Sequence, residues 1–352
     1  MDSIIDSLGG ILHEQGEFSF TERGHAVEGA QIVLKNHLVT IPDTLETSEA
    51  RGSFLFIDGG EGVILDTPDV VVVRLRIVGV LFEGVARKEV LIKEHTVLIS
   101  RKKGFSIIAE PALPALCATA LPHGSLAEMP GLLRKRLECA YALEWLERIE
   151  LAGQSRVAQS EKFAKILSVK TPSAKAPSAK RLLDAVIFDG ALTTTDEFIK
   201  REQGVLVKKT AMLAIAKTST LLCTNGTSLP SAMQQIADVP AYVILSRQGN
   251  EGNAMIALAA KLHARAQFSF VIEAALSFAG AKKIERMLAA LLPLCSDISF
   301  LGYPYPLVLA DQLARVTNEE VAAEKTRMTV TLAEQGKFTL RTVHGILDTM
   351  RF

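Results

Sequence analysis

Two strongly apolar segments of the sequence each end in an aspartate followed by glycine. Residues 54–57 (FLFI) precede Asp58, and residues 185–188 (AVIF) precede Asp189. If the two segments are neighbouring central strands, the carboxylates lie in a low-dielectric cleft and repel each other unless a cation lies between them. Carboxylate oxygens suit Mg²⁺ or Mn²⁺. The pair therefore predicts a metal site; the alternative is two ordinary turns, because Asp-Gly is a common turn pair.

A third carboxylate can come from a segment with helical periodicity. Residues 126–152 place apolar side chains three and four positions apart, which predicts a helix. Glu138 lies among the apolar residues of this segment, and Glu144 and Glu147 compete with it for the role. The alternative for Glu138 is a surface ion pair with Arg134, four residues earlier.

A further carboxylate lies in the C-terminal segment 301–315 (LGYPYPLVLADQLAR). Its two prolines and two tyrosines predict a rigid turn that leads into a helix carrying Asp311. Tyr303 and Tyr305, if they lie at the mouth of a cleft, can stack on unpaired bases. The alternative is that this turn is structural alone.

Several other chemistries lack their motifs. The segment after residue 187 resembles the loop of haloacid-dehalogenase phosphatases, but Ile187 stands where that chemistry needs a nucleophilic aspartate. The sequence contains no GxxxxGK[ST], HExxH or GxSxG motif. His123 and His263 lack another His or Cys at ligand spacing, and the four cysteines form no CxxC pair, which is typical of free thiols in a reducing cytosol.

The elements that position these residues follow from hydrophobic patterning. We expect an α/β or α+β layered fold without two independent domains, with a core over about residues 50–330 and a basic, flexible insertion over about 153–181. The pattern predicts helices over residues 1–35, 126–152, 194–214, 282–295 and from 307, and strands over 52–65 (with a turn at Gly59-Gly60), 69–80, 90–99, 182–188, 212–223, 241–245, 254–262 and 268–273.

The charge is balanced in total but not along the chain. The 352 residues carry 39 basic and 39 acidic side chains, and 48% of them are apolar, which excludes a disordered chain and a strongly basic nucleic-acid binder. Residues 1–100 carry 8 basic and 16 acidic side chains, whereas residues 156–181 carry seven basic ones against Glu161. The basic run is either a footprint for a polyanion or a solvated loop. The N-terminus has acidic residues where a signal peptide needs basic ones and no apolar run is long enough for a membrane span, so we expect a cytoplasmic location.

Together these motifs resemble the NurA nuclease family, DNA nucleases that partner the HerA translocase. The resemblance rests on FIDGG, a Glu-bearing helix, VIFDGAL, AIAKTS, LHARAQFSFVIEA and GYPYPLVLADQLARV, between about residues 54 and 316, and the last motif is the most specific. It implies an RNase H-like mixed sheet flanked by helices, with inserted elements. It also implies a homodimer that cleaves DNA with Mn²⁺, or Mg²⁺, by a two-ion mechanism.

Site residues carry over from the family position by position. Asp58 and Asp189 match the metal-binding aspartates, Glu138 is the best match for the helical glutamate, and Lys217 matches the lysine that would neutralise charge developing on phosphorus. Where family members carry an Ala-His pair, this chain has Ala310 and Asp311. Either Asp311 replaces that histidine, or His263 is the relevant one.

The resemblance also implies partners. DNA ends, single- and double-stranded, would be held through their phosphates by Lys208, Lys209 and loop residues such as Lys175 and Lys180. A HerA-type hexameric ATPase would deliver DNA for end resection in double-strand break repair, with 5′–3′ exonuclease and single-strand endonuclease activity; no membrane is expected. Two other functions stay open: a catalytically silent scaffold that binds DNA or a translocase, and an actin-like ATPase, for which residues 249–252 (GNEG) are a weak second loop.

Overall fold

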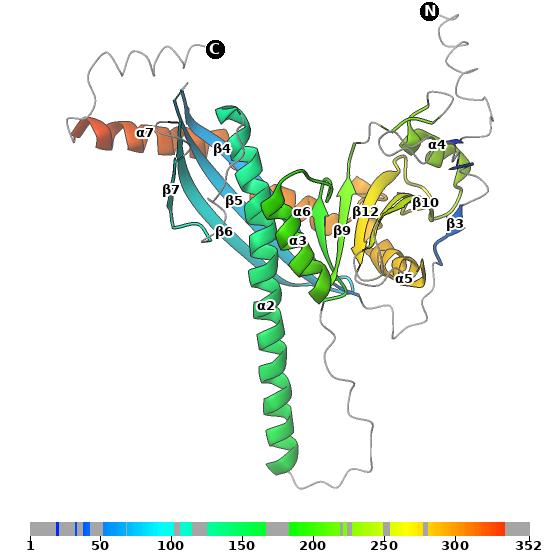
Figure 1. Cartoon of the computed structure of the whole chain (residues 1–352). Helices are drawn as coiled ribbons and strands as arrows, with labels where there is room; N and C mark the ends of the chain where they lie inside the picture. Colours follow the sequence, from blue (N-terminus) through cyan, green and yellow to red (C-terminus); the bar gives the residue numbers. More distant parts are fainter. Residues whose placement is uncertain are drawn as a thin grey trace, which may run out of the picture.

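A ten-stranded mixed sheet forms the centre of the molecule in the computed structural model (Figure 1). The structure describes residues 19–20, 32–33, 38–42, 52–67, 69–101, 106–114, 125–166, 183–218, 221–223, 227–248, 254–276 and 281–334. The strands are β1 (Ser19–Phe20), β2 (Ile32–Val33), β3 (Val39–Thr40), β4 (Ser53–Asp66), β5 (Val70–Glu83), β6 (Ala86–Ser100), β7 (Ser106–Glu110), β8 (Ala185–Asp189), β9 (Ala211–Ala216), β10 (Ala241–Gln248), β11 (Ala254–Lys261) and β12 (Phe270–Leu276). The α-helices are α2 (Met129–Ile166), α3 (Glu197–Lys209), α4 (Leu229–Ile236), α5 (Ala281–Leu291), α6 (Tyr305–Ala314) and α7 (Asn318–Glu334), with 3₁₀ turns η2 (Leu126–Glu128), η3 (Leu292–Cys295) and η4 (Ile298–Phe300).

The strand order places β4, β8 and β9 in the middle of the sheet. The order is β3-β10-β11-β12-β9-β8-β4-β5-β6-β7, with β4–β8 and β8–β9 parallel and the other pairs antiparallel. Central parallel strands are covered on both faces, which explains the uninterrupted apolar runs of β8 and β9.

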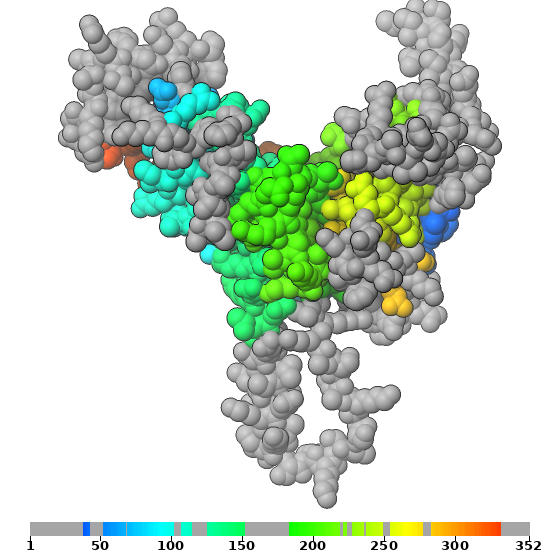
Figure 2. All heavy atoms as spheres, in the orientation of Figure 1, coloured from blue at the N-terminus to red at the C-terminus, as the bar shows by residue number. Residues whose placement is uncertain are grey.

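Alternate side chains of β4 enter two separate cores. Leu55 and Ile57 pack in the cluster that contains apolar residues of α2 and α3, whereas Phe54 and Phe56 pack with residues of α5 and α6. In Figure 1, α2 and α3 accordingly lie in front of the sheet and α6 lies behind it. Figure 2 shows α3 at the centre of the front face, between β5–β6 residues in cyan and β10–β12 residues in yellow.

The structure corrects four expectations about secondary structure. β4 is one strand of 14 residues that passes through Gly59 and Gly60 without a turn. α2 continues to Ile166, into the segment expected to be a loop, while residues 167–182 lie outside the described ones. The helix expected over 194–214 ends at Lys209, after which β9 begins. Residues 19–20 and 32–33 pair as β1 and β2 instead of forming a helix; the rest of 1–35 is not described.

Two further features complete the frame. Arg74 and Arg76 of β5 form ion pairs with Glu324 and Glu320, which hold α7 against the far half of the β4–β5 hairpin.

Within the described part of the chain, no helix combines the length and the apolar character that a membrane crossing requires.

Candidate metal centre

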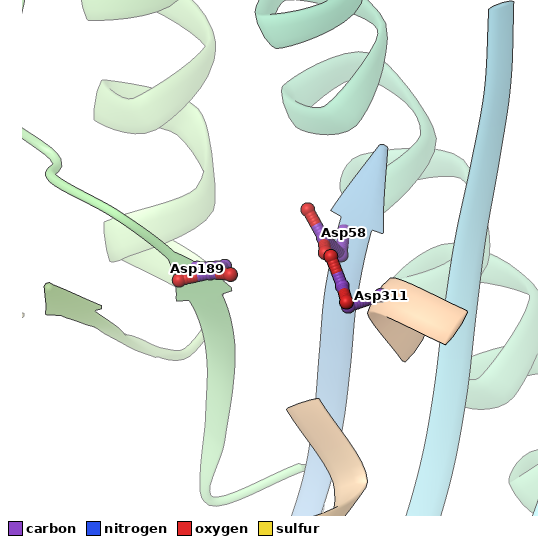
Figure 3. Close-up of side chains that lie close together, drawn as sticks. All are labelled: Asp58, Asp189 and Asp311. Atoms are coloured by element: carbon purple, nitrogen blue, oxygen red, sulfur yellow. The ribbon is translucent and has the colours of Figure 1, made fainter. Parts of the chain in front are cut away.

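Three carboxylates meet where the central strands and α6 converge. Asp58 of β4, Asp189 of β8 and Asp311 of α6 each offer a carboxylate oxygen, and these oxygens all lie within 4.8 Å of one another (Figure 3). The parallel register pairs Ile57 with Phe188, which places the two following aspartates side by side. The prediction that Asp58 and Asp189 lie together at neighbouring central strands is therefore confirmed.

Close packing against β4 brings α6 to the cluster. A Cβ atom on Gly60 would lie 1.9 Å from the carbonyl oxygen of Ala314, so only glycine lets the end of α6 approach the strand this closely. Asp311 lies one helical turn earlier and faces Asp58. The Gly59-Gly60 pair, which resembles a turn in the sequence, thus serves close approach within an extended strand.

Burial makes the charged form of Asp58 unfavourable. Removal from water, followed by the negative charge of Asp189, raises the pKa of Asp58 from 3.8 to about 6. The backbone N–H of Gly59 donates a hydrogen bond to its Oδ1 (2.8 Å) and partly opposes this effect. A group in this environment becomes stable as a carboxylate when a cation binds nearby.

Glu138 lies near Asp58 and is equally buried, each being 7% exposed. Burial raises the pKa of Glu138 to about 8; the Arg134 cation opposes the rise, and the charge of Asp58 adds to it. Arg134 donates to Glu138 Oε1 (3.1 Å) and to the carbonyl oxygen of Gly59 (2.7 Å). Glu138 also lines a cavity of about 40 Å³ together with Asp189. The ion pair between Glu138 and Arg134 that the spacing predicts is therefore present, but it lies beside the carboxylate cluster and not on the surface.

The competing glutamates of α2 lie elsewhere. Glu144 pairs with Lys93 (3.1 Å) and Glu147 pairs with Lys209 (2.9 Å), and both carboxylates are more than half exposed. Of the three glutamates considered from the sequence, Glu138 is thus the one that reaches the cluster.

Two residues anchor Asp189 in its orientation. Lys217 Nζ lies 2.5 Å from Asp189 Oδ2, and the Tyr303 hydroxyl donates to Oδ1 (3.2 Å). Burial lowers the pKa of Lys217, but the hydrogen bond and the charge of Asp189 outweigh this effect and raise it. Tyr303 is only 6% exposed and its ring packs against Phe270. Tyr303 contacts the site in two ways: its hydroxyl group bonds Asp189, and Lys217 Nζ lies over its ring, 5.5 Å from the ring centre.

Glu273 is a site residue that sequence reasoning missed. Its Oε2 accepts hydrogen bonds from the backbone N–H groups of Leu192 (2.7 Å) and Thr193 (2.8 Å), and its Oε1 accepts from the Thr193 hydroxyl (3.0 Å). These bonds hold the loop that follows Asp189. The sequence contains one indication of this role, a single acidic residue within the otherwise apolar strand FVIEAAL.

The structure does not bring the remaining described candidates into the carboxylate cluster. His263 follows β11, where its Nδ1 accepts from the backbone N–H of Arg265 (3.1 Å), and the cluster found among the described residues does not include it. Lys208 and Lys209 are at the end of α3, and Tyr305, 39% exposed, begins α6. Lys175 and Lys180 lie outside the described residues.

The donor set fits a divalent ion that prefers oxygen ligands. The cluster offers hard carboxylate oxygens, includes no thiol or imidazole among the described residues, and brings negative charges together in a partly dry place. Asp58, Asp189 and Asp311 are positioned to hold such an ion, and Glu138 is a further carboxylate that shares a cavity with Asp189.

Comparison with solved structures identifies the fold. The crystal structure of the NurA nuclease from Sulfolobus solfataricus aligns over 95% of this chain and 95% of its own, with a TM-score of 0.54 and 11% identity. The catalytic domain of human endonuclease V aligns over 85% of this chain and 94% of its own (TM-score 0.37, 14% identity). Ciona intestinalis endonuclease V, in complex with a 24mer DNA containing an inosine followed by a ribo-adenosine, aligns over 89% and 97% (TM-score 0.36, 10% identity).

Sequence comparison gives no such match: no family model and no curated protein matches the chain. The structural likeness to NurA nevertheless confirms the expected fold class, a mixed sheet flanked by helices in an RNase H-like α/β arrangement. The chain has a NurA-like fold, with a carboxylate cluster on its central strands.

Proposed function

We propose that this protein is a divalent-metal-dependent nuclease that hydrolyses phosphodiester bonds in DNA. The observation that carries the proposal is the meeting of Asp58, Asp189 and Asp311 on the central strands and α6 of a NurA-like fold. The sequence motifs point the same way, because the resemblance to NurA nucleases rests on the segments that carry these three residues.

Divalent ions bound to these carboxylates would acidify a water molecule and stabilise negative charge on the phosphate and on the leaving oxygen. Asp58, Asp189 and Asp311 would be the ligands of these ions, and Glu138 is the proposed additional ligand. Lys217, held against Asp189, would supply a fixed positive charge next to the phosphate group as its charge increases. The Tyr303 hydroxyl would keep Asp189 in its orientation.

The basic side chains away from the cluster would bind the DNA backbone. Lys208 and Lys209 end α3, and Lys175 and Lys180 belong to the basic run of the sequence. Contacts of this kind neutralise phosphates without reading bases, so the affinity they contribute falls steeply with salt.

A degradation assay tests the activity. Wild-type protein, Asp58→Ala and Asp189→Ala are incubated with single-stranded and duplex DNA in Mn²⁺, in Mg²⁺ or in EDTA. Asp66→Ala is the matched control, because Asp66 ends the same strand β4 and is exposed. We expect cleavage by wild type and Asp66→Ala with Mn²⁺ or Mg²⁺, and none with EDTA or with either site variant. Cleavage by the site variants at the wild-type rate would show that the assignment is wrong.

The same assay separates the alternatives. A wild-type protein that binds DNA without cutting it would be a scaffold, and ATP hydrolysis that depends on Asp58 would indicate the actin-like ATPase. Residues 249–252, the loop that this ATPase would need, lie outside the described part of the structure.

We further propose that the nuclease acts as a homodimer in the cytoplasm, on DNA ends supplied by a HerA-type hexameric ATPase during double-strand break repair. This rests on the resemblance to NurA nucleases and is supported by the NurA-like fold. Light scattering after gel filtration measures the mass of the assembly, and co-purification with the candidate ATPase tests the partnership. Duplexes labelled at one 5′ or 3′ end, compared with circular single strands, test the expected 5′–3′ exonuclease and single-strand endonuclease activities.

A further inference from the structure

A second cavity adjoins the carboxylate cluster on the side of β12 and α6. It has a volume of about 590 Å³, within the range of small-ligand sites, and Lys217, Tyr303 and Asp311 belong to its lining. The cavity therefore opens directly onto the residues proposed to bind the metal and the phosphate.

Exposed apolar side chains form a wall of this cavity. Phe268 is 67% exposed, Phe300 is 44% exposed and Ile298 is 89% exposed. Large apolar side chains that cluster on a surface mark a binding site more often than single ones do. The Phe rings lie on two different segments, the turn before β12 and η4, and neither ring is needed to fill the cores around the sheet.

The two segments that carry these rings are fixed to each other. Gly302 has a φ of +90°, and a Cβ atom there would lie 2.6 Å from Cβ of Ala266, so the two turns are in close contact. The backbone N–H of Gly302 donates to Cys295 (2.8 Å), and the Gln234 side chain donates to the carbonyl oxygen of Ala266 (2.5 Å). The wall is thus held in shape before any ligand binds.

The charges of the lining match a phosphodiester strand. Lys217 and the exposed Arg265 are the basic residues of the lining, and Asp311, part of the metal cluster, is its acidic one among the described residues. Proteins bind unpaired nucleotides with aromatic rings that stack on the bases and with nearby cations that contact the phosphates. This cavity has both, next to the proposed metal centre. A second copy of this chain would gain little from burying the two cations.

We propose that this cavity binds the unpaired nucleobase next to the phosphate at the carboxylate cluster, with Phe268 and Phe300 as the stacking surface and Arg265 facing the backbone. The inference rests on the proposed nuclease function and goes beyond it. It predicts that the DNA strand bound at the moment of cleavage has at least one unstacked base. Every base has an aromatic face, so this subsite selects unpaired DNA over duplex and not one sequence over another.

Binding in Ca²⁺ buffer tests the subsite separately from cleavage. Fluorescence anisotropy measures the affinity of a labelled single-stranded oligonucleotide, and of the same length of sugar-phosphate strand with abasic residues in the middle. We expect the wild type to bind the base-containing strand roughly ten-fold or more tightly, because base–aromatic stacking accounts for differences of this size. The Phe268→Ala/Phe300→Ala double variant should lose this preference, and Phe268→Trp should keep it.

The matched control is Ile108→Ala. Ile108 is 68% exposed, like Phe268, but lies on the edge strand β7 at one end of the sheet. The Ile108→Ala variant should bind the base-containing and the abasic oligonucleotide with the same affinities as the wild type. Equal affinity of the wild type for the two strands, no binding of either, or unchanged preference in the double variant would each overturn the subsite. So would a change in molecular mass of the double variant in light scattering, since the wall would then be an interface between copies.

The outcome is distinguishable from failure of the nuclease proposal. If the wild type prefers strands with bases but cuts no DNA in Mn²⁺ or Mg²⁺, the subsite stands and the nuclease proposal fails. If Asp58-dependent cleavage is found without a preference for bases, the nuclease proposal stands and the subsite fails.

Discussion

Replacing Asp58 with asparagine should stabilise the protein when no metal is bound. Asparagine has nearly the same shape as aspartate, and its carbonyl oxygen can still accept the hydrogen bond from the N–H of Gly59. It removes the negative charge that burial and Asp189 make unfavourable. The substitution thus separates two roles of one carboxylate, ligand and buried charge.

The size of the effect follows from the pKa. A rise from 3.8 to about 6 means that the ionised form of Asp58 destabilises the folded state by about 3 kcal/mol at pH values well above 6. The folded protein binds the proton more tightly than the unfolded chain does, so stability falls as pH rises from about 4 to about 6 and stays reduced above that range. Asp58→Asn should gain up to about 3 kcal/mol at pH 8 and almost nothing at pH 4.

Urea unfolding in EDTA measures this difference. The chain has one tryptophan, Trp145, which is 1% exposed and packs in the core between α2 and the sheet, so its fluorescence reports the loss of the fold. Titration with Mn²⁺ at pH 8 gives the second measurement. A bound ion at a hundred times its dissociation constant stabilises the folded state by about 2.7 kcal/mol, and this gain should be present in the wild type and absent from Asp58→Asn.

Asp66→Asn is the control, since Asp66 is exposed at the end of the same strand. It should change neither the stability in EDTA nor the gain with Mn²⁺. The reasoning is refuted if Asp58→Asn is less stable than the wild type at pH 8 in EDTA, or if Mn²⁺ stabilises both proteins equally.

Three other substitutions test neighbouring features. Glu138→Gln should flatten the loss of stability that the wild type shows in EDTA as pH rises from about 4.5 to about 8, because burial raises the pKa of Glu138 to about 8; an unchanged slope in urea melts would exclude this residue as the cause. Gly60→Ala should destabilise by about 1–3 kcal/mol and weaken Mn²⁺ binding, since its Cβ would lie 1.9 Å from the carbonyl oxygen of Ala314; Gly204→Ala in α3, where nothing lies within 4 Å, should be neutral or stabilising in the same melts. Glu273→Ala should weaken Mn²⁺ binding by about 10- to 100-fold in a calorimetric titration by releasing the loop after Asp189, whereas Glu273→Gln keeps acceptor oxygen and should lose less; equal losses would argue against a positioning role.

The sequence predicts the central pair of carboxylates because each of them directly follows a segment whose own composition identifies it as a buried strand. Asp58 and Asp189 each follow an uninterrupted apolar run, and such runs are typical of strands covered on both faces. Their parallel pairing was not predicted and is seen in the structure. Glu138 is also found from helical spacing, but its choice over Glu144 and Glu147 needed the path of α2 across the sheet.

Other features depend on contacts between distant segments and leave little local signal. Gly59-Gly60 resembles a turn, and only the approach of α6 explains why glycines occur in a continuous strand. Asp311 and His263 were open alternatives, because a one-dimensional pattern does not say which segment reaches β4. The bonds from Glu273 to the loop after Asp189 join residues about 80 positions apart and could not be inferred from spacing.

The three carboxylates come from segments that leave the ribosome at very different times. β4 emerges early and β8 near the middle of the chain, whereas α6 follows all ten strands of the described sheet. A nascent or truncated chain that ends before α6 contains Asp58 and Asp189 without Asp311, and its β4 lacks the helix that packs on Gly60. The proposed metal centre is therefore complete only after α6 has been made and has folded back against β4, so folding of the C-terminal segment controls when the three carboxylates come together.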